Sequence, residues 1–94
     1  MVDVERLARI LKLFSVEARI RIVHALRRRA MCVTELTSQL GISQEATSQH
    51  LRVLRDAGIV WFQKRGFHVY YSLDKQSMAF IHKAVSTLYE PGNT

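Results

Sequence analysis

The fold is decided by the stretch Ile42-Ser43-Gln44-Glu45-Ala46-Thr47-Ser48-Gln49-His50-Leu51-Arg52-Val53-Leu54-Arg55-Asp56-Ala57-Gly58. Ser43 is well suited to begin a helix, because its hydroxyl can accept hydrogen bonds from the N–H groups of the first turn. Gly58 is well suited to end it, because glycine adopts the left-handed conformation of a helix end without steric cost. Apolar residues recur between them at helical spacing, which predicts that one face of the helix packs on a core. They are Ala46, Leu51, Val53, Leu54 and Ala57.

The other face of this predicted helix carries polar side chains of short or medium length that both donate and accept hydrogen bonds. An ordinary solvated helix would carry mostly glutamate and lysine instead. Base edges in the major groove of DNA are read by donors and acceptors of this kind. We therefore predict that this face binds DNA, and the alternative is a polar surface helix without a ligand. The predicted DNA-binding residues of the helix are Ser43, Gln44, Thr47, Ser48, Gln49, His50 and Arg52.

The size and charge of the chain agree with a small nucleic-acid-binding domain. The 94 residues, of which 48% are hydrophobic, suffice for one domain over residues 1–94 with a modest core. Residues 90–94 are predicted to be a frayed tail. The formal net charge of +6 favours a polyanionic partner such as double-stranded DNA. A generic basic surface would give the same excess of charge.

Several features of the sequence indicate a cytoplasmic protein. No apolar run approaches the roughly 20 residues that cross a bilayer, so we expect no membrane contact. The first residues, Met1 to Glu5, lack the pattern of a signal peptide. The single cysteine, Cys32, excludes an internal disulfide and suits a reducing compartment.

The first half of the chain predicts three helices. The first runs from about Asp3 to Phe14, and the second runs from about Val16 to Arg28 with Ser15 as its N-cap. A short strand at residues 31–33 precedes the third helix, from about Val33 to Leu40. This third helix, a tight connection at Gly41 and the Ser43 helix form a helix-turn-helix, whose second member enters the major groove.

The residues after Gly58 predict a two-stranded hairpin, or wing. Residues 59–64 and 67–73 are rich in β-branched and aromatic residues and flank a turn at Arg65-Gly66. Lys64, Arg65 and His68 lie near the tip, where they are expected to contact phosphate or the minor groove. The bulky residues of the hairpin are predicted to pack down rather than to stack on bases. They are Trp61, Phe62, Tyr70 and Tyr71.

A last helix is predicted from about Lys75 to Tyr89, with Asp74 as its cap. Both terminal helices carry apolar residues at 3-4-3 spacing, so we predict that together they form a homodimer interface. The alternative is that both stripes cover the core of the monomer. The predicted interface residues are Val4, Leu7, Leu11, Met78, Ile81, Val85 and Leu88. The predicted fold is α+β and mostly α: a winged helix-turn-helix with about five helices and a two-stranded hairpin.

Over nearly its whole length the chain resembles the ArsR-type (ArsR/SmtB) winged helix-turn-helix repressors of bacteria and archaea. The resemblance implies a dimeric repressor that binds a near-palindromic operator and leaves it when an inducer binds. The stretches that carry the resemblance are Leu13–Ile22, Val33–Leu36, Ser43–Val60 and Tyr70–Leu73.

Two metal sites known in that family are incomplete in this sequence. One site uses two cysteines that flank a valine, and the matching residues here are Cys32-Val33-Thr34. The other pairs Asp-x-His with His-x-x-Glu on the last helix. Zinc and soft metals prefer nitrogen and sulfur ligands, so we predict no metal site and no cofactor. The matching positions of the second site are Asp74, Gln76, Thr87 and Glu90.

The signal that such a regulator would sense is left open by the sequence. Cys32 is a candidate thiol sensor, because a helix N-terminus and nearby arginines favour a thiolate. The alternative is that Cys32 is a small buried apolar residue. An apolar ligand pocket between the terminal helices, or no small-molecule inducer at all, are further alternatives.

We therefore predict a sequence-specific DNA-binding transcriptional regulator, a homodimeric repressor released by an unidentified signal. The alternative function is a winged-helix module for protein interaction or assembly, without sequence-specific DNA binding. An enzyme is not expected, because the sequence has no nucleophile–base pair, no glycine-rich phosphate loop and no credible carboxylate pair.

Overall fold

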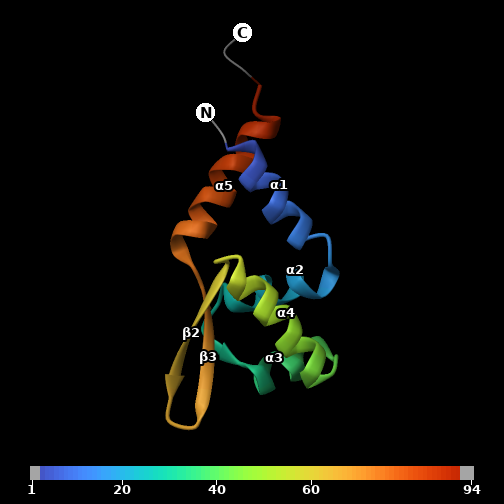
Figure 1. The fold of residues 1–94 in the computed structure, drawn as a ribbon, viewed down its shortest axis with the longest axis vertical. Coiled ribbons are helices and arrows are strands. Elements are labelled where there is room, and N and C mark those ends of the chain that lie inside the picture. The colour runs from blue at the N-terminus through green and yellow to red at the C-terminus, as the bar shows by residue number, and fades with distance from the viewer. Residues whose placement is uncertain (1–2, 92–94) are drawn as a thin grey trace.

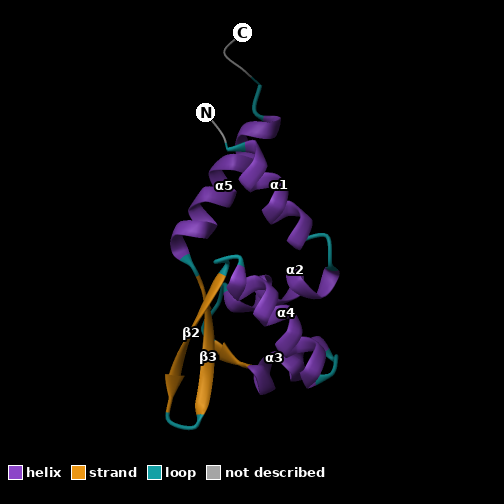
Figure 2. Ribbon diagram, in the orientation of Figure 1, coloured by secondary structure: helices purple, strands orange, loops and turns teal. Residues whose placement is uncertain are grey.

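The structure is a computed structural model that describes residues 3–91. Within these residues the chain folds into helices and three short strands (Figures 1 and 2). The elements, in chain order, are α1 (Val4–Leu13), α2 (Glu17–Leu26), β1 (Met31–Cys32), α3 (Val33–Leu40), α4 (Gln44–Asp56), β2 (Val60–Arg65), β3 (His68–Leu73) and α5 (Lys75–Tyr89). The winged helix-turn-helix predicted from the sequence is confirmed. Residues 92–94 of the predicted frayed tail lie outside the described residues.

The starts of α4 and α5 follow the capping residues that the sequence predicts, α1 begins after an Asp3 cap, and α2 departs from its prediction. Asp3 accepts a hydrogen bond from the N–H of Arg6, and Asp74 accepts one from the N–H of Ser77. At the start of α2, however, the N-cap is Val16, whose side chain makes no capping hydrogen bond. The prediction that Ser15 caps this helix is wrong, because its hydroxyl donates backwards to the Lys12 carbonyl at 2.7 Å.

The wing is broader than predicted, since three strands form one antiparallel sheet in the order β1-β3-β2. Cys32 pairs with Tyr70, which ties the start of the helix-turn-helix to the hairpin. Arg65 pairs with His68, so the turn lies at residues 66–67, one residue later than predicted. Gly66 has a φ of 62°, a left-handed conformation that glycine adopts without steric cost.

The main core lies where α2, α3 and α4 meet the base of the sheet. Burial of apolar side chains in this core supplies most of the hydrophobic stabilisation. The fully buried ones are Ile22, Leu36, Leu51, Leu54 and Ile59. The terminal helices α1 and α5 extend together to the opposite end of the molecule from the wing tip (Figure 1). The molecule is therefore elongated, with extents of 54 × 23 × 21 Å.

The aromatic residues of the wing pack less completely than predicted. Tyr70 and Tyr71 are half-buried, and the Tyr71 ring lies 5.9 Å from that of Phe62. Trp61 and Phe62 nevertheless remain exposed, and so does Phe67 in the turn. Trp61 and Phe62 lie on β2, an edge strand of a small sheet, which offers too little surface to cover these rings. In the described part of the chain, none of the helices has the length and apolar character needed to cross a membrane.

Candidate nucleic-acid interface

The outer face of α4 presents a compact group of polar side chains. Ser43 begins the helix, since its Oγ accepts a hydrogen bond from the Ala46 N–H at 3.0 Å. The opposite face buries Leu51 and Leu54 completely, which fixes how the helix is rotated about its axis. A shallow hollow on the outer face is lined by Gln44, Glu45, Ser48, Gln49 and Arg52. These side chains are exposed and are free of core packing.

The prediction that Thr47 belongs to this exposed face is wrong. Thr47 has 0% exposure and lies on the buried side of α4. Its hydroxyl donates to the Ser43 carbonyl at 2.9 Å, and it accepts a hydrogen bond from the Thr37 hydroxyl at 2.9 Å. Thr37 belongs to α3, so this pair fixes the two helices of the helix-turn-helix against each other. Thr47 therefore positions α4 and has no surface with which to contact a base.

His50 is held by the body of the protein more firmly than expected. Its ring is half-buried, and its Nδ1 accepts a hydrogen bond from the Nε of Arg19 on α2 at 3.3 Å. Burial, and then the charge of Arg19, lower the pKa of His50 below the ordinary value of 6.5. The ring is therefore neutral at neutral pH and carries its proton on Nε2, the nitrogen that would donate to a base or phosphate. The DNA contact of His50 stays a prediction.

The cations of the wing are placed as the sequence predicts, near the end of the hairpin. Lys64, Arg65 and His68 are all exposed. The Arg65 guanidinium donates to Gln63 Oε1 at 3.2 Å and lies over the Tyr70 ring, 5.5 Å from its centroid. These contacts restrict the arginine without neutralising its charge. The wing thus carries an oriented positive charge near its end.

The predicted dimer residues divide into buried and exposed groups. Leu7 is only 3% exposed within its own chain, so the prediction that it contacts a partner is wrong. Met78 and Ile81 are partly buried against the core, and Val85 is half-buried. The outward residues of the terminal helices are large, apolar and exposed: Val4 (70%), Leu11 (42%), Leu88 (63%) and Tyr89 (73%).

Cys32 lies buried at the junction of β1 and α3. Its N–H donates to Glu35 Oε1 at 3.2 Å, which helps to begin α3. Glu35 also forms a 2.8 Å salt bridge with Arg29, and this hydrogen-bonded pair lowers the pKa of Glu35. The burial of Cys32 supports its interpretation as a small apolar residue. A role as a thiol sensor stays a prediction.

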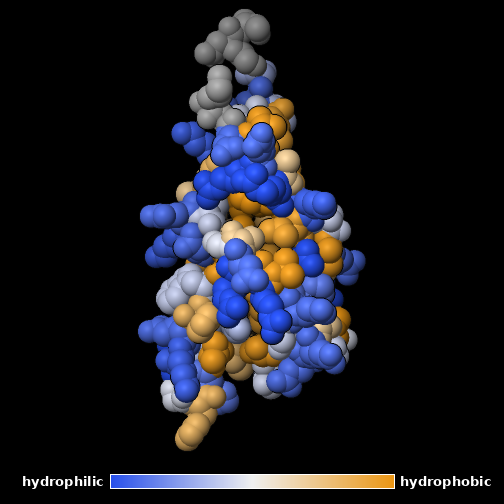
Figure 3. All heavy atoms as spheres, viewed as in Figure 1, coloured by the Kyte–Doolittle hydropathy of each residue, from blue (hydrophilic) through white to orange (hydrophobic). Residues whose placement is uncertain are grey.

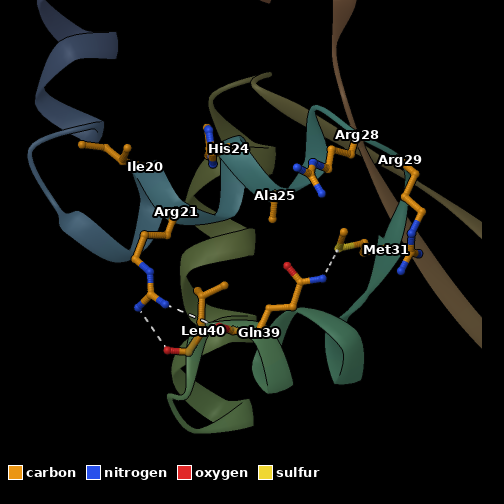
Figure 4. Close-up of a pocket in the computed structure, with 9 residues that line it drawn as sticks. All are labelled: Ile20, Arg21, His24, Ala25, Arg28, Arg29, Met31, Gln39 and Leu40. Atoms are coloured by element: carbon orange, nitrogen blue, oxygen red, sulfur yellow. Dashed lines mark hydrogen bonds between the residues drawn. The ribbon is translucent and has the colours of Figure 1, made fainter.

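A cavity of about 530 Å³ opens between α2, β1 and α3 (Figure 4). Arg21 donates to the carbonyls of Leu40 at 3.0 Å and Gln39 at 3.4 Å, so it binds the C-terminal end of α3. Gln39 in turn contacts the sulfur of Met31. Arg21 and Gln39 thus hold α3 in place against α2 and β1.

A helix-turn-helix with a capped second helix, followed by a cationic hairpin, defines the class of winged helix-turn-helix proteins. Residues 17–61, which contain the helix-turn-helix, match the family described as "Bacterial regulatory protein, arsR family". The chain belongs to the ArsR family, since regulators that are at least 32% identical to it also match over more than two thirds of both sequences.

Curated relatives of the chain include a transcriptional activator and a transcriptional repressor. The transcriptional activator HlyU of Vibrio cholerae is 34% identical over 84 residues, covering 89% of this chain and 78% of HlyU. A homolog of the cadmium resistance regulatory protein CadC from Staphylococcus aureus is 32% identical, covering 81% of this chain and 69% of that protein. The transcriptional repressor SmtB of Mycobacterium tuberculosis is 38% identical, but this chain spans only 53% of its length.

Solved structures of the family superimpose on nearly the whole chain. Reduced HlyU from Vibrio cholerae has a TM-score of 0.76 at 33% identity, covering 95% of this chain and 94% of that one. The transcriptional repressor BigR from Xylella fastidiosa has a TM-score of 0.71 at 32% identity, covering 96% and 89%. The overall fold is thus common to all three chains.

Proposed function

We propose that this protein regulates transcription by binding a near-palindromic operator in double-stranded DNA as a homodimer. The observation that carries the proposal is the exposed polar face of α4 beside the cationic wing. Gln44, Ser48, Gln49 and Arg52 offer donors and acceptors of the length that reaches base edges. Lys64 and Arg65 supply the phosphate contacts that orient a protein on the duplex.

The proposed dimer forms through the outward faces of α1 and α5. Val4, Leu11, Leu88 and Tyr89 leave apolar surface at one end of the molecule. Burial of such surface between two identical chains is favourable. A two-fold axis would also place two α4 helices on successive turns of one duplex, which matches a near-palindromic site.

The direction of regulation is proposed to be repression, as in SmtB of Mycobacterium tuberculosis, although HlyU of Vibrio cholerae is named an activator. Release from the operator would follow a signal that acts on this chain. The protein would work in the cytoplasm, where bacterial DNA lies, and it would act by binding rather than by catalysis.

The test is selection of bound duplexes from a random pool, followed by fluorescence anisotropy on the selected and on a scrambled duplex. The Gln49→Ala variant should weaken binding to the selected duplex by about 10-fold or more, and affect the scrambled duplex much less. The matched control is Gln76→Ala, which removes an exposed glutamine at the start of α5 and should leave both affinities unchanged. Equal affinity of the wild type for all duplexes would refute the proposal.

A further inference from the structure

A larger cavity than the one beside α3 lies between α1, the α1–α2 connection and α2. It has a volume of about 720 Å³, which is within the range of small-molecule sites. Its apolar walls are formed by Ile10, Leu13, Val16 and Ala57, the last from the end of α4. Figure 3 shows hydrophobic residues in the middle of the viewed face of the molecule, with hydrophilic residues above and below them.

Four cationic side chains surround these apolar walls: Arg6, Arg9, Lys12 and Arg19. None of the described residues that line the cavity is acidic. An apolar surface bordered by cations fits a ligand that has an apolar body and a negatively charged head. A highly hydrated inorganic anion would not contact the apolar walls, and a neutral apolar molecule would form no ion pair with the cations.

Two of the four cations are already held in position by the protein. The Arg6 guanidinium lies 3.9 Å from the centroid of the Phe80 ring. Arg19 donates to the Leu13 carbonyl at 3.5 Å through one terminal nitrogen and to His50 through Nε. A ligand therefore meets a partly preorganised charge, which lowers the entropy cost of binding.

The proposed dimer face does not cover this cavity. At 100° per residue, Leu11 points about 160° around α1 from both Arg9 and Leu13. A second subunit packed on the exposed Leu11 side would thus leave the cavity on the opposite side of the helix open.

We propose that this cavity binds a small amphipathic organic anion, of the alkyl or aryl carboxylate class. The carboxylate contacts Arg9 and Arg19, and the apolar body covers Ile10, Leu13 and Val16. Arg19 also holds His50 on α4, so the ligand and the recognition helix share one guanidinium. The binding site itself does not depend on the proposed DNA function, and it is tested without DNA.

The experiment is calorimetric titration of the full chain with octanoate, compared with 1-octanol and inorganic phosphate. Octanoate should saturate one site per chain and bind about tenfold or more tightly than either control, because one lacks the charge and the other lacks the apolar body. Equal affinity for octanoate and phosphate, or for octanoate and octanol, would overturn the proposal.

Variants locate the site. Arg9→Glu reverses an exposed charge on α1 and should weaken octanoate binding by about tenfold or more. The matched control, Arg28→Glu, reverses an exposed arginine of the cavity beside α3 and should have no effect. Loss of binding in Arg28→Glu with full binding in Arg9→Glu would overturn the assignment.

An NMR titration of the His50 ring gives a second readout. It distinguishes binding beside Arg19 from unspecific binding elsewhere on the surface. Saturation with octanoate should raise the pKa of His50 towards its ordinary value, because the carboxylate offsets the charge of Arg19. The exposed ring of His24 in the other cavity serves as the internal reference. Equal changes at both rings would contradict binding at Arg19.

Discussion

The buried threonine pair between α3 and α4 gives the sharpest stability prediction. Thr47→Val keeps the shape of the side chain and removes the hydroxyl that bonds to Thr37 and to the Ser43 carbonyl, both at 2.9 Å. Thr47 is fully buried, and the Ser43 carbonyl keeps the hydrogen bond that it accepts from the Thr47 N–H. The group that loses its partner is therefore the half-buried hydroxyl of Thr37. One net hydrogen bond contributes about 1 kcal/mol, and a buried group left without a partner costs about 1–3 kcal/mol.

We therefore expect Thr47→Val to lower the free energy of unfolding by about 2 kcal/mol. For a domain of this size that corresponds to a fall in Tm of about 10 °C. Urea unfolding followed by circular dichroism measures the change. Thr34→Val, at an exposed position of α3, is the matched control and should have little effect.

A double-mutant cycle separates the pair from its surroundings. The variant that carries both Thr37→Val and Thr47→Val should be more stable than the sum of the two single changes predicts, by about 0.5 kcal/mol or more. Strict additivity, or a loss below about 0.5 kcal/mol in Thr47→Val, would refute the view that this pair fixes α4 on α3.

Three further predictions concern charge and assembly. The pKa of His50 lies below 6.5 in the folded state, so its contribution to stability is fully present above that pH and is lost as the pH falls towards the folded-state value. Urea unfolding at about pH 8 and about pH 5.5 should show this loss, and the loss should shrink in His50→Gln. Arg65→Ala should weaken binding to all duplexes alike and reduce the slope of log affinity against log salt by about 0.9. A slope equal to that of the wild type would contradict the phosphate contact of Arg65. Leu88→Asp should weaken self-association by about tenfold or more in sedimentation equilibrium, whereas Phe67→Asp at the wing turn should not; equal effects would contradict the proposed interface.

The parts of the fold set by local chemistry were predictable from the sequence. The bounds of α3 and α5 agree with the prediction, because Gly41 and Asp74 end and begin helices through contacts within a few residues. The brief strand at Met31–Cys32 was also expected. Its pairing with β3 was not, because a two-residue strand has no periodicity and its partner lies almost 40 residues away.

The candidate site was predictable only in outline. Thr47 was assigned to the polar face because of its hydroxyl, although its spacing with Leu51 and Leu54 places all three on one side of the helix. That spacing was the signal for its burial. The bond from Arg19 to His50 joins residues 31 positions apart, and no local pattern reveals it. The burial of Leu7 depends likewise on how α1 packs, which its own regular spacing cannot distinguish from an exposed stripe.

The most direct test of the central claim is an NMR titration of the ¹⁵N-labelled protein with a duplex taken from the selection. The account predicts that the largest amide shift changes fall at residues 43–52, on the exposed side of α4, and at residues 64–68 of the wing. Changes confined to α2 and α3, with those two segments unaffected, would contradict it.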